Sequence, residues 1–136
     1  MHLFHLAFPV NDLNETRRFY HDILQCPVGR ESQRWIDFDF HGHQITAHLS
    51  DVIAKTGTNP VDGESVPVRH FGAILDMIAW KKLAERLQHL GVEFLISPQI
   101  RFAGETGEQA TLFIRDPSGN ALEFKAFSDA NCIFKK

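Results

Sequence analysis

Two histidines stand at matching places in two similar stretches of the sequence. His5 lies in the apolar run Leu3–Val10, and His70 opens a second apolar run that ends at Asp76. An amphipathic helical pattern follows each run, so the two stretches form a weak internal repeat that predicts two related structural units. Imidazole is the commonest side-chain ligand of metals in proteins, which makes His5 and His70 candidate metal ligands.

Glu123 and His48 are two further candidates, and strand geometry relates them. Each lies an even number of residues after the glycine that precedes the last strand of its half, Gly119 and Gly42 respectively. Side chains at even spacing share one face of a strand, so both should point to the same side of equivalent strands. Two imidazoles and one carboxylate form a set that holds a divalent metal and leaves positions open for substrate.

The same count places His48 one same-face step, about 6–7 Å, farther along its strand than Glu123. Its role stays open between a fourth metal ligand, an acid/base that moves a proton, and a packed core residue. Taken singly, His5 also fits an ordinary core or interface position, and Glu123 fits the solvent side of an edge strand. Taken together, burying one carboxylate and two imidazoles on one face costs free energy unless a cation is present, which favours a metal site.

Apolar periodicity predicts the same order of elements in both halves of one α+β domain, with modules at about 1–50 and 70–128. The first half has a strand at 3–10, a helix at about 12–24 and two or three strands that include 35–40 and 44–50. Residues 51–69 lack periodicity and are predicted to be the linker, with a short helical turn at its start. The second half has elements at 70–75, 77–90, 92–96, 109–115 and 121–127, with a strand broken by a loop at 98–107.

Composition limits the class of protein. The 136 residues carry a net charge of −3 and a hydrophobic fraction of 43%, which fits one packed domain and argues against nucleic acid as a partner. No apolar run approaches the length of about 20 residues that a membrane span needs, and the N-terminus lacks the layout of a signal peptide. Cys26 and Cys132 have no metal-binding spacing, so we expect reduced thiols in a cytoplasmic protein.

Three stretches together resemble the vicinal oxygen chelate superfamily, which includes glyoxalases, bleomycin-resistance proteins and extradiol dioxygenases. They are His5-Leu-Ala-Phe-Pro-Val-Asn-Asp-Leu with Phe19-Tyr20, His70-Phe-Gly-Ala and, most specific of the three, Asp116-Pro-Ser-Gly-Asn-Ala-Leu-Glu123-Phe. The resemblance covers essentially the whole chain and is closest to small single-domain proteins predicted to be extradiol-type dioxygenases. It implies two βαβββ modules that form a curved mixed sheet. It also implies metal binding by His5, His70 and Glu123, with His48 where lyases of the superfamily place a fourth ligand.

The resemblance implies a divalent-metal-dependent enzyme that acts on a small-molecule substrate chelated through vicinal oxygens. An extradiol-type dioxygenase is the first expectation, with Fe(II) as the metal and Mn, Zn or Ni as alternatives. His48 would move a proton, and Arg101, Gln109 and Thr111 are the candidate substrate-binding residues. Arg101 is equally compatible with a surface charge on an edge strand.

Two other functions remain open. One is a glyoxalase-like lyase or isomerase that uses Zn(II) or Ni(II) as a Lewis acid, and the other is a ligand-sequestering protein without turnover. Ring-cleaving members carry a tyrosine on the strand before the one that bears the glutamate, where this chain has Thr111 and Phe113. We expect a homodimer, with modules that pair either within one chain or across the dimer.

Overall fold

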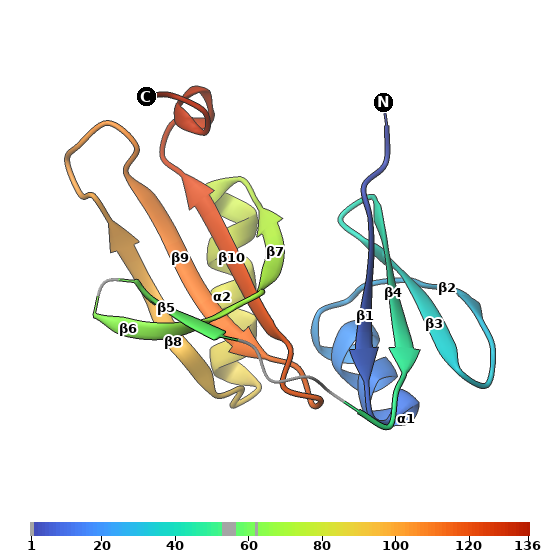
Figure 1. The fold of residues 1–136 in the computed structure, drawn as a ribbon. Coiled ribbons are helices and arrows are strands. Elements are labelled where there is room, and N and C mark those ends of the chain that lie inside the picture. The colour runs from blue at the N-terminus through green and yellow to red at the C-terminus, as the bar shows by residue number, and fades with distance from the viewer. Residues whose placement is uncertain (1, 53–56, 62) are drawn as a thin grey trace. The chain divides into compact units, whose positions relative to one another are not determined.

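The computed structural model describes residues 2–52, 57–61 and 63–136, and the chain divides into two compact units. Unit one comprises residues 1–55 together with the turn 116–120, and unit two comprises residues 56–115 and 121–136. Each unit holds a four-stranded mixed sheet whose elements follow in the order strand, helix, strand, strand, strand (Figure 1). This order confirms the predicted α+β class and the paired βαβββ modules.

Module one is the βαβββ part of unit one, and its strands are arranged in the order β1-β4-β3-β2. A short α-helix begins after Asp12, whose side chain accepts a hydrogen bond from the backbone N–H of Glu15 at 2.8 Å, as an N-cap residue does. The helix continues directly into a π-helical turn. The elements are β1 (His5–Val10), α1 (Leu13–Arg17), η1 (Arg18–Ile23), β2 (Val28–Glu31), β3 (Trp35–Phe40) and β4 (His43–Leu49).

Tyr20 lies at the centre of the core of module one. Strand alternation turns the apolar side chains of β1, β3 and β4 toward α1 and η1, and Tyr20 enters this layer from η1 with no solvent exposure. Its ring centroid lies 5.5 Å from that of Phe8 and 5.2 Å from that of Phe38, which is the usual spacing of packed aromatic pairs. The opposite face of this sheet is therefore left for polar side chains.

Module two is the βαβββ part of unit two, and it repeats the same strand order as β7-β10-β9-β8. Asp76 caps its helix by accepting the N–H of Ala79 at 2.8 Å. Trp80 fixes the helix on the sheet, because its buried indole N–H donates to the carbonyl oxygen of Phe124 at 2.9 Å. The elements are β7 (Phe71–Ile74), α2 (Met77–His89), β8 (Phe94–Arg101), β9 (Gln109–Arg115) and β10 (Ala121–Phe127), followed by the short helical turn η2 (Ala130–Cys132).

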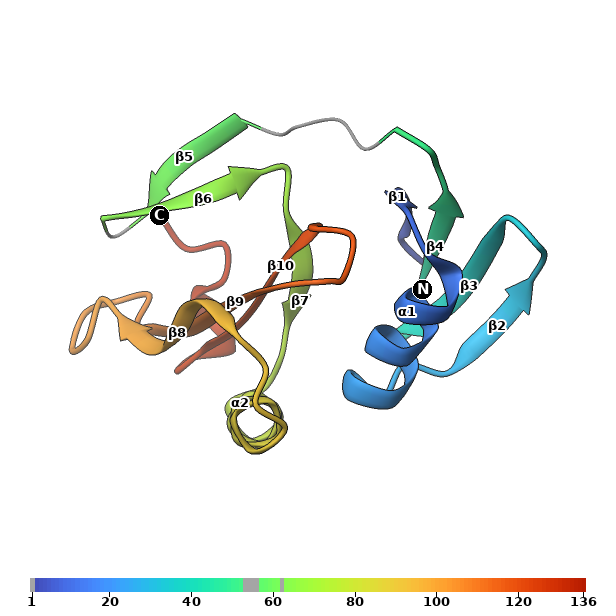
Figure 2. The same ribbon diagram turned by 90° about the horizontal axis from the view of Figure 1, so that it is seen from below.

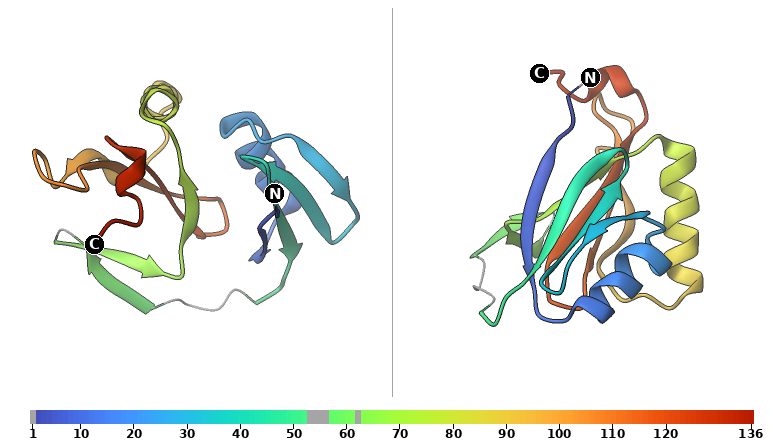
Figure 3. Two further views of the ribbon diagram at one scale, coloured as in Figure 1. Left: turned by 90° about the horizontal axis from the view of Figure 1, so that it is seen from above. Right: turned by 90° about the vertical axis from the view of Figure 1, so that its right-hand side faces the viewer.

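The segment 51–69, predicted to be a linker without regular structure, contains an antiparallel hairpin instead. Its strands are β5 (Gly57–Val61) and β6 (Glu64–Val68). Views along the sheet show the hairpin and α2 on opposite sides of module two (Figures 2 and 3). Val66 is fully buried against Ile96 and Phe113, and this apolar contact with the sheet is what stabilises the hairpin. The helical turn predicted at the start of the segment falls partly on residues 53–56, outside the described residues.

β8 also differs from the prediction, because it continues through the position where a break was expected. The register between β8 and β9 shifts between Ile96 and Gln99, on either side of Pro98. A proline cannot donate to the strand ladder and is accommodated at such an irregularity. Among the helices that the structure describes, none has both the length and the apolar character required to cross a bilayer.

The register of the two sheets shows which residues occupy equivalent positions in the two modules. In module one, Ala7 of β1 lies opposite Thr46 of β4. In module two, Gly72 of β7 lies opposite Glu123 of β10. Because Ala7 follows His5 by two residues, as Gly72 follows His70, Thr46 occupies the place in module one that Glu123 occupies in module two.

Candidate metal centre

The structure brings His70 and Glu123 together on one face of module two. The imidazole Nε2 of His70 lies 3.3 Å from the carboxylate Oε1 of Glu123. Both side chains are mostly buried, with exposed fractions of 27% for His70 and 11% for Glu123. Two of the predicted metal ligands are thus in contact within module two.

Hydrogen bonds on the outer atoms hold this pair in place. The Nδ1 atom of His70 donates to the carbonyl oxygen of Pro67 at 2.7 Å, since a carbonyl can only accept. The hydroxyl of Thr111 donates to Oε2 of Glu123 at 2.7 Å. These contacts are of the kind that orient metal-ligating side chains and fix the imidazole tautomer.

The donor atoms of this pair fit a divalent cation. With its proton on Nδ1, a neutral His70 presents the Nε2 lone pair toward an anionic oxygen. Two lone pairs that face each other repel unless a cation or a proton lies between them. Ligand atoms bound about 2.1 Å from one ion at right angles lie about 3 Å apart, close to the observed separation of 3.3 Å.

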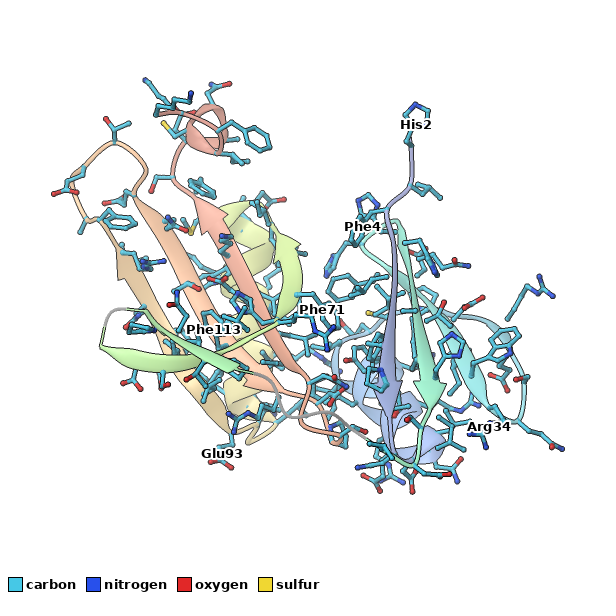
Figure 4. The ribbon with its side chains drawn as sticks, in the orientation of Figure 1. His2, Phe4, Arg34, Phe71, Glu93 and Phe113 are labelled. Atoms are coloured by element: carbon cyan, nitrogen blue, oxygen red, sulfur yellow. The ribbon has the colours of Figure 1, made fainter. Side chains whose placement is uncertain are left out.

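The surroundings of Glu123 add one positive and one aromatic group. Lys125 follows it by two residues on the same face, and its Nζ lies 4.0 Å from Oε1 of Glu123. The ring of Phe113 lies edge-on to that of His70 with a centroid separation of 5.0 Å. Figure 4 shows Phe113 on β9, behind the β5–β6 hairpin. The sequence prediction missed Lys125, although its same-face spacing from Glu123 was a signal that could have found it.

His5 belongs to unit one and lies at the start of β1, with an exposed side chain. It is in register with Gln44 of β4, on the sheet face turned away from α1. The backbone just before it is anchored, because the N–H of Phe4 donates to Nδ1 of His43 at 2.9 Å. Within the described residues, no three His, Cys, Asp or Glu side chains gather into a ligand cluster, so His5 as the third ligand stays a prediction.

His48 lies on the same sheet face as His5, as its parity predicted. Its partner across β1 is Pro9, and its partner across β3 is Trp35. Since Thr46 is the counterpart of Glu123, His48 stands one same-face step beyond it, about 6–7 Å along the strand. Its imidazole is exposed, which argues against a packed core residue.

The three candidate substrate-binding residues all share the Glu123 face of module two. Register pairs Arg101 of β8 with Gln109 of β9, and Thr111 with Lys125. The Thr111 hydroxyl is engaged by Glu123, so its observed contact positions the carboxylate. The side-chain amide oxygen of Gln109, Oε1, is buried and has no hydrogen-bond partner within the described part of the chain. This oxygen is therefore an acceptor that a ligand could use. The guanidinium of Arg101 lies 4.8 Å from the ring centroid of Phe102.

The turn that leads into β10 is fixed in unit one by a buried polar cluster. Tyr20 donates through its hydroxyl to Oδ2 of Asp116 at 2.8 Å, and the amide of Asn120 donates both to Asp116 and to the carbonyl oxygen of Pro9. Burial raises the pKa of Asp116 and raises that of Tyr20 well above its usual value, the nearby Asp116 carboxylate adding to the latter shift. The cluster is thus structural: it fixes Asn120, the residue just before β10 begins and three residues before Glu123.

Comparison with known proteins places these features in context. A family model described as the Glyoxalase/Bleomycin resistance protein/Dioxygenase superfamily matches residues 2–124. A crystal structure of a glyoxalase/bleomycin resistance protein/dioxygenase from Alicyclobacillus acidocaldarius is 34% identical, covers 98% of this chain and 96% of that one, and has a TM-score of 0.82.

Two more distant relatives share the fold. The structure of the genomically encoded fosfomycin resistance protein FosX from Listeria monocytogenes is 20% identical over 97% of each chain, with a TM-score of 0.72. The virulence protein STM3117 of Salmonella typhimurium is 23% identical over 124 residues, which are 90% of this chain and 82% of that protein. At these identities the likeness concerns the fold alone.

Proposed function

The chain belongs to the Glyoxalase/Bleomycin resistance protein/Dioxygenase superfamily, and from this premise we propose that it is a divalent-metal-dependent enzyme. Its substrate is a small molecule chelated through two neighbouring oxygens. The first candidate reaction is extradiol-type dioxygenation with Fe(II); Mn, Zn or Ni are the alternative metals. The metal ligands are His70 and Glu123 of module two and His5 of module one.

The His70–Glu123 pair is the observation that carries this proposal. A nitrogen and a carboxylate oxygen face each other at 3.3 Å; the other ring nitrogen of His70 donates to the Pro67 carbonyl, and the other oxygen of Glu123 accepts from Thr111. Metal-ligating histidines and carboxylates are oriented by supporting hydrogen bonds of this kind. When bound, the metal would supply Lewis-acid activation of the two substrate oxygens and, as iron, a site for O₂.

The chain's own residues then bind substrate and move protons. The side-chain amide oxygen of Gln109 accepts a hydrogen bond from the substrate. Arg101 and Lys125 supply positive charge on the same face of the sheet and hold an anionic oxygen of the substrate. His48 holds or transfers a proton at its exposed imidazole, one step beyond the Glu123-equivalent position. Thr111 keeps the Glu123 carboxylate oriented.

A glyoxalase-like lyase or isomerase is the second candidate, and one observation favours it. On β9, the described residues that share the Glu123 face are Gln109, Thr111, Phe113 and Arg115, so no tyrosine lies beside Glu123 on that strand. The one tyrosine of the chain, Tyr20, is buried and bonded to Asp116 in unit one. A phenol from β9 is therefore not available as an acid for ring cleavage.

Metal analysis combined with oxygen uptake separates these functions. The purified chain is loaded anaerobically with Fe²⁺, desalted and mixed with a panel of catechols in an oxygen electrode. Iron near one per chain with oxygen consumption supports the dioxygenase. Stoichiometric Zn or Ni, with no oxygen consumption by the iron form, supports the lyase or isomerase. Failure to bind any divalent metal contradicts the proposal and leaves ligand sequestration.

We further propose a cytoplasmic homodimer. Both cysteines are free thiols, as expected in a reducing compartment. Large apolar side chains remain exposed within each unit, including Ile74 at 46% and Ile78 at 70%, and such surface is available for association. Light scattering at micromolar concentration tests the assembly: a mass of two chains is expected, and a single-chain mass contradicts it.

A further inference from the structure

A cavity of about 300 Å³ lies on the polar side of module one, and no role proposed above uses it. Its lining includes the side chains of Asp37, Asp39 and Gln44, with Arg30 and Leu3 also contributing. Gly29 also lines it. The volume is at the lower end of the range that holds small ligands.

The carboxylates of this cavity are held in place but not neutralised. Asp37 accepts the hydroxyl of Thr46 at 2.6 Å, and Asp39 accepts the backbone N–H of Gly42 at 2.8 Å. In the part of the chain that the structure describes, neither carboxylate has a lysine, arginine or histidine at ion-pair distance, and Arg30 has no carboxylate at that distance. His43 also lines the cavity, and Asp39 acts electrostatically on His41. Two fixed carboxylates and one cation at the same cavity leave a net negative site that attracts a positively charged group.

Strand register connects this cavity to the candidate metal ligand of the same module. His5 of β1 lies opposite Gln44 of β4, and Gln44 lies opposite Asp39 of β3. Adjacent strands are about 4.8 Å apart, so the row from His5 to Asp39 spans about 10 Å. A molecule bound near His5 through its oxygens can therefore extend along this row and place its other end beside Asp39.

We propose that the cavity is a substrate subsite for an ammonium group, and that the substrate joins vicinal oxygens to an amine-bearing tail. This inference rests on the proposed function, because His5 is taken as a metal ligand. The tail's N–H groups donate to the free carboxylate oxygen of Asp39 and to the amide oxygen of Gln44. Its carbon atoms lie against Leu3 and the backbone of Gly29.

Three catechols that differ only in their tail test the proposal by calorimetry on the chain loaded with redox-inert Zn²⁺. One carries an aminoethyl group, one a carboxymethyl group and one a methyl group. The aminoethyl catechol should bind about threefold to fivefold more tightly than the methyl one, as expected for an exposed ion pair, and the carboxymethyl catechol more weakly. Asp39→Asn, which keeps the oxygen that accepts from Gly42, should remove this preference. Equal affinities in the unaltered chain would overturn the inference.

A matched control and a metal-independent measurement separate this inference from the proposed function. Glu85→Gln makes the same change in net charge at an exposed position of α2 and should retain the preference. In the metal-free chain, phenethylammonium should shift the amide NMR signals of Gly29 and Gly42, and Asp37→Asn/Asp39→Asn should abolish the shifts. If no catechol binds the zinc form while these shifts persist, the metal site fails and the ammonium subsite stands. Absence of the shifts overturns the subsite.

Discussion

The two modules share one strand order and one register, yet they present different chemistry on equivalent positions. In module two, Glu123 lies opposite Gly72 and contacts His70. In module one, the equivalent position holds Thr46, which lies opposite Ala7. The repeat therefore supplies a common scaffold, and single residue differences on β4 and β10 place a carboxylate beside a histidine in module two and a threonine at the equivalent position of module one.

Each module pairs a threonine hydroxyl with a carboxylate, but the positions are exchanged. Thr111 of β9 donates to Glu123 of β10 at 2.7 Å, whereas Thr46 of β4 donates to Asp37 of β3 at 2.6 Å. In module two the carboxylate is thus on the central strand beside a histidine. In module one it is one strand farther from His5 and lines the cavity. The same kind of hydrogen bond therefore orients a carboxylate beside His70 in one sheet and a carboxylate at the cavity in the other.

The largest expected effect on turnover comes from replacing His48. His48 follows Thr46 by two residues on the same face of β4, as Lys125 follows Glu123 on β10. His48→Ala should leave the metal content nearly unchanged and lower turnover by about a hundredfold to ten-thousandfold, the usual loss for an acid/base. Metal analysis and turnover of the best catechol are measured on the same preparation. Metal content that falls together with turnover would make His48 a fourth ligand instead.

Gly72→Ala tests the difference between the two parallel strand pairs. A Cβ at Gly72 would lie 1.5 Å from the carbonyl oxygen of Glu123, so β7 and β10 must separate, at a cost of about 2–3 kcal/mol or more. The matched change in module one, Ala7→Gly, should cost only about 0.5–1 kcal/mol. Urea denaturation gives both free energies of unfolding. Equal costs would show that the close approach at Gly72 does not distinguish the modules.

Tyr20→Phe tests how the turn before β10 is held. The change removes the hydroxyl that donates to Asp116 and leaves this buried carboxylate with its remaining partners, the N–H groups of Ser118 and Asn120 and the Asn120 amide. Loss of one partner from a buried acceptor should lower the free energy of unfolding by about 1–3 kcal/mol. A change below about 0.5 kcal/mol would contradict a structural role for this bond.

The smallest effect concerns the two thiols, one in each unit. Burial of Cys26, which is 3% exposed, raises its pKa to about 12, so at pH 8 it stays protonated and covered. Cys132 is partly exposed. A disulfide reagent at pH 8 should therefore modify one thiol per native chain quickly and two after denaturation. Two thiols reacting at one rate in the native chain would contradict the packing of module one.

Strong periodicity made much of the fold predictable from sequence. β9 and β10 alternate clearly, and both match their predicted bounds 109–115 and 121–127. Parity placed Glu123 and His48 on equivalent faces, and the internal repeat paired His70 with His5; the contact between His70 and Glu123 is a finding of the structure. The hairpin 57–68 was missed because its prolines, Pro60 and Pro67, disfavour strand prediction, and its stability comes from burying Val66 on distant residues.

Contacts made by backbone atoms and diagonal neighbours escaped prediction for a different reason. The Pro67 carbonyl that orients His70 is a main-chain atom, which no residue type signals. Thr111 as a substrate-binding residue stays a prediction, and the bond from its hydroxyl to Glu123 is a diagonal contact that the sequence did not indicate. Register shows which residues share a face, and only the side-chain rotamers show which of them touch.

The central claim is that module two supplies the anionic metal ligand, and metal occupancy of Glu123→Gln tests it most directly. The unaltered chain, Glu123→Gln and Asp37→Asn, which alters the threonine-bonded carboxylate of module one, are loaded with Mn²⁺, desalted and measured by elemental analysis. We expect about one metal per chain in the unaltered protein and in Asp37→Asn, and far less than one in Glu123→Gln, which keeps the shape but loses the charge. Full occupancy in Glu123→Gln would contradict the account.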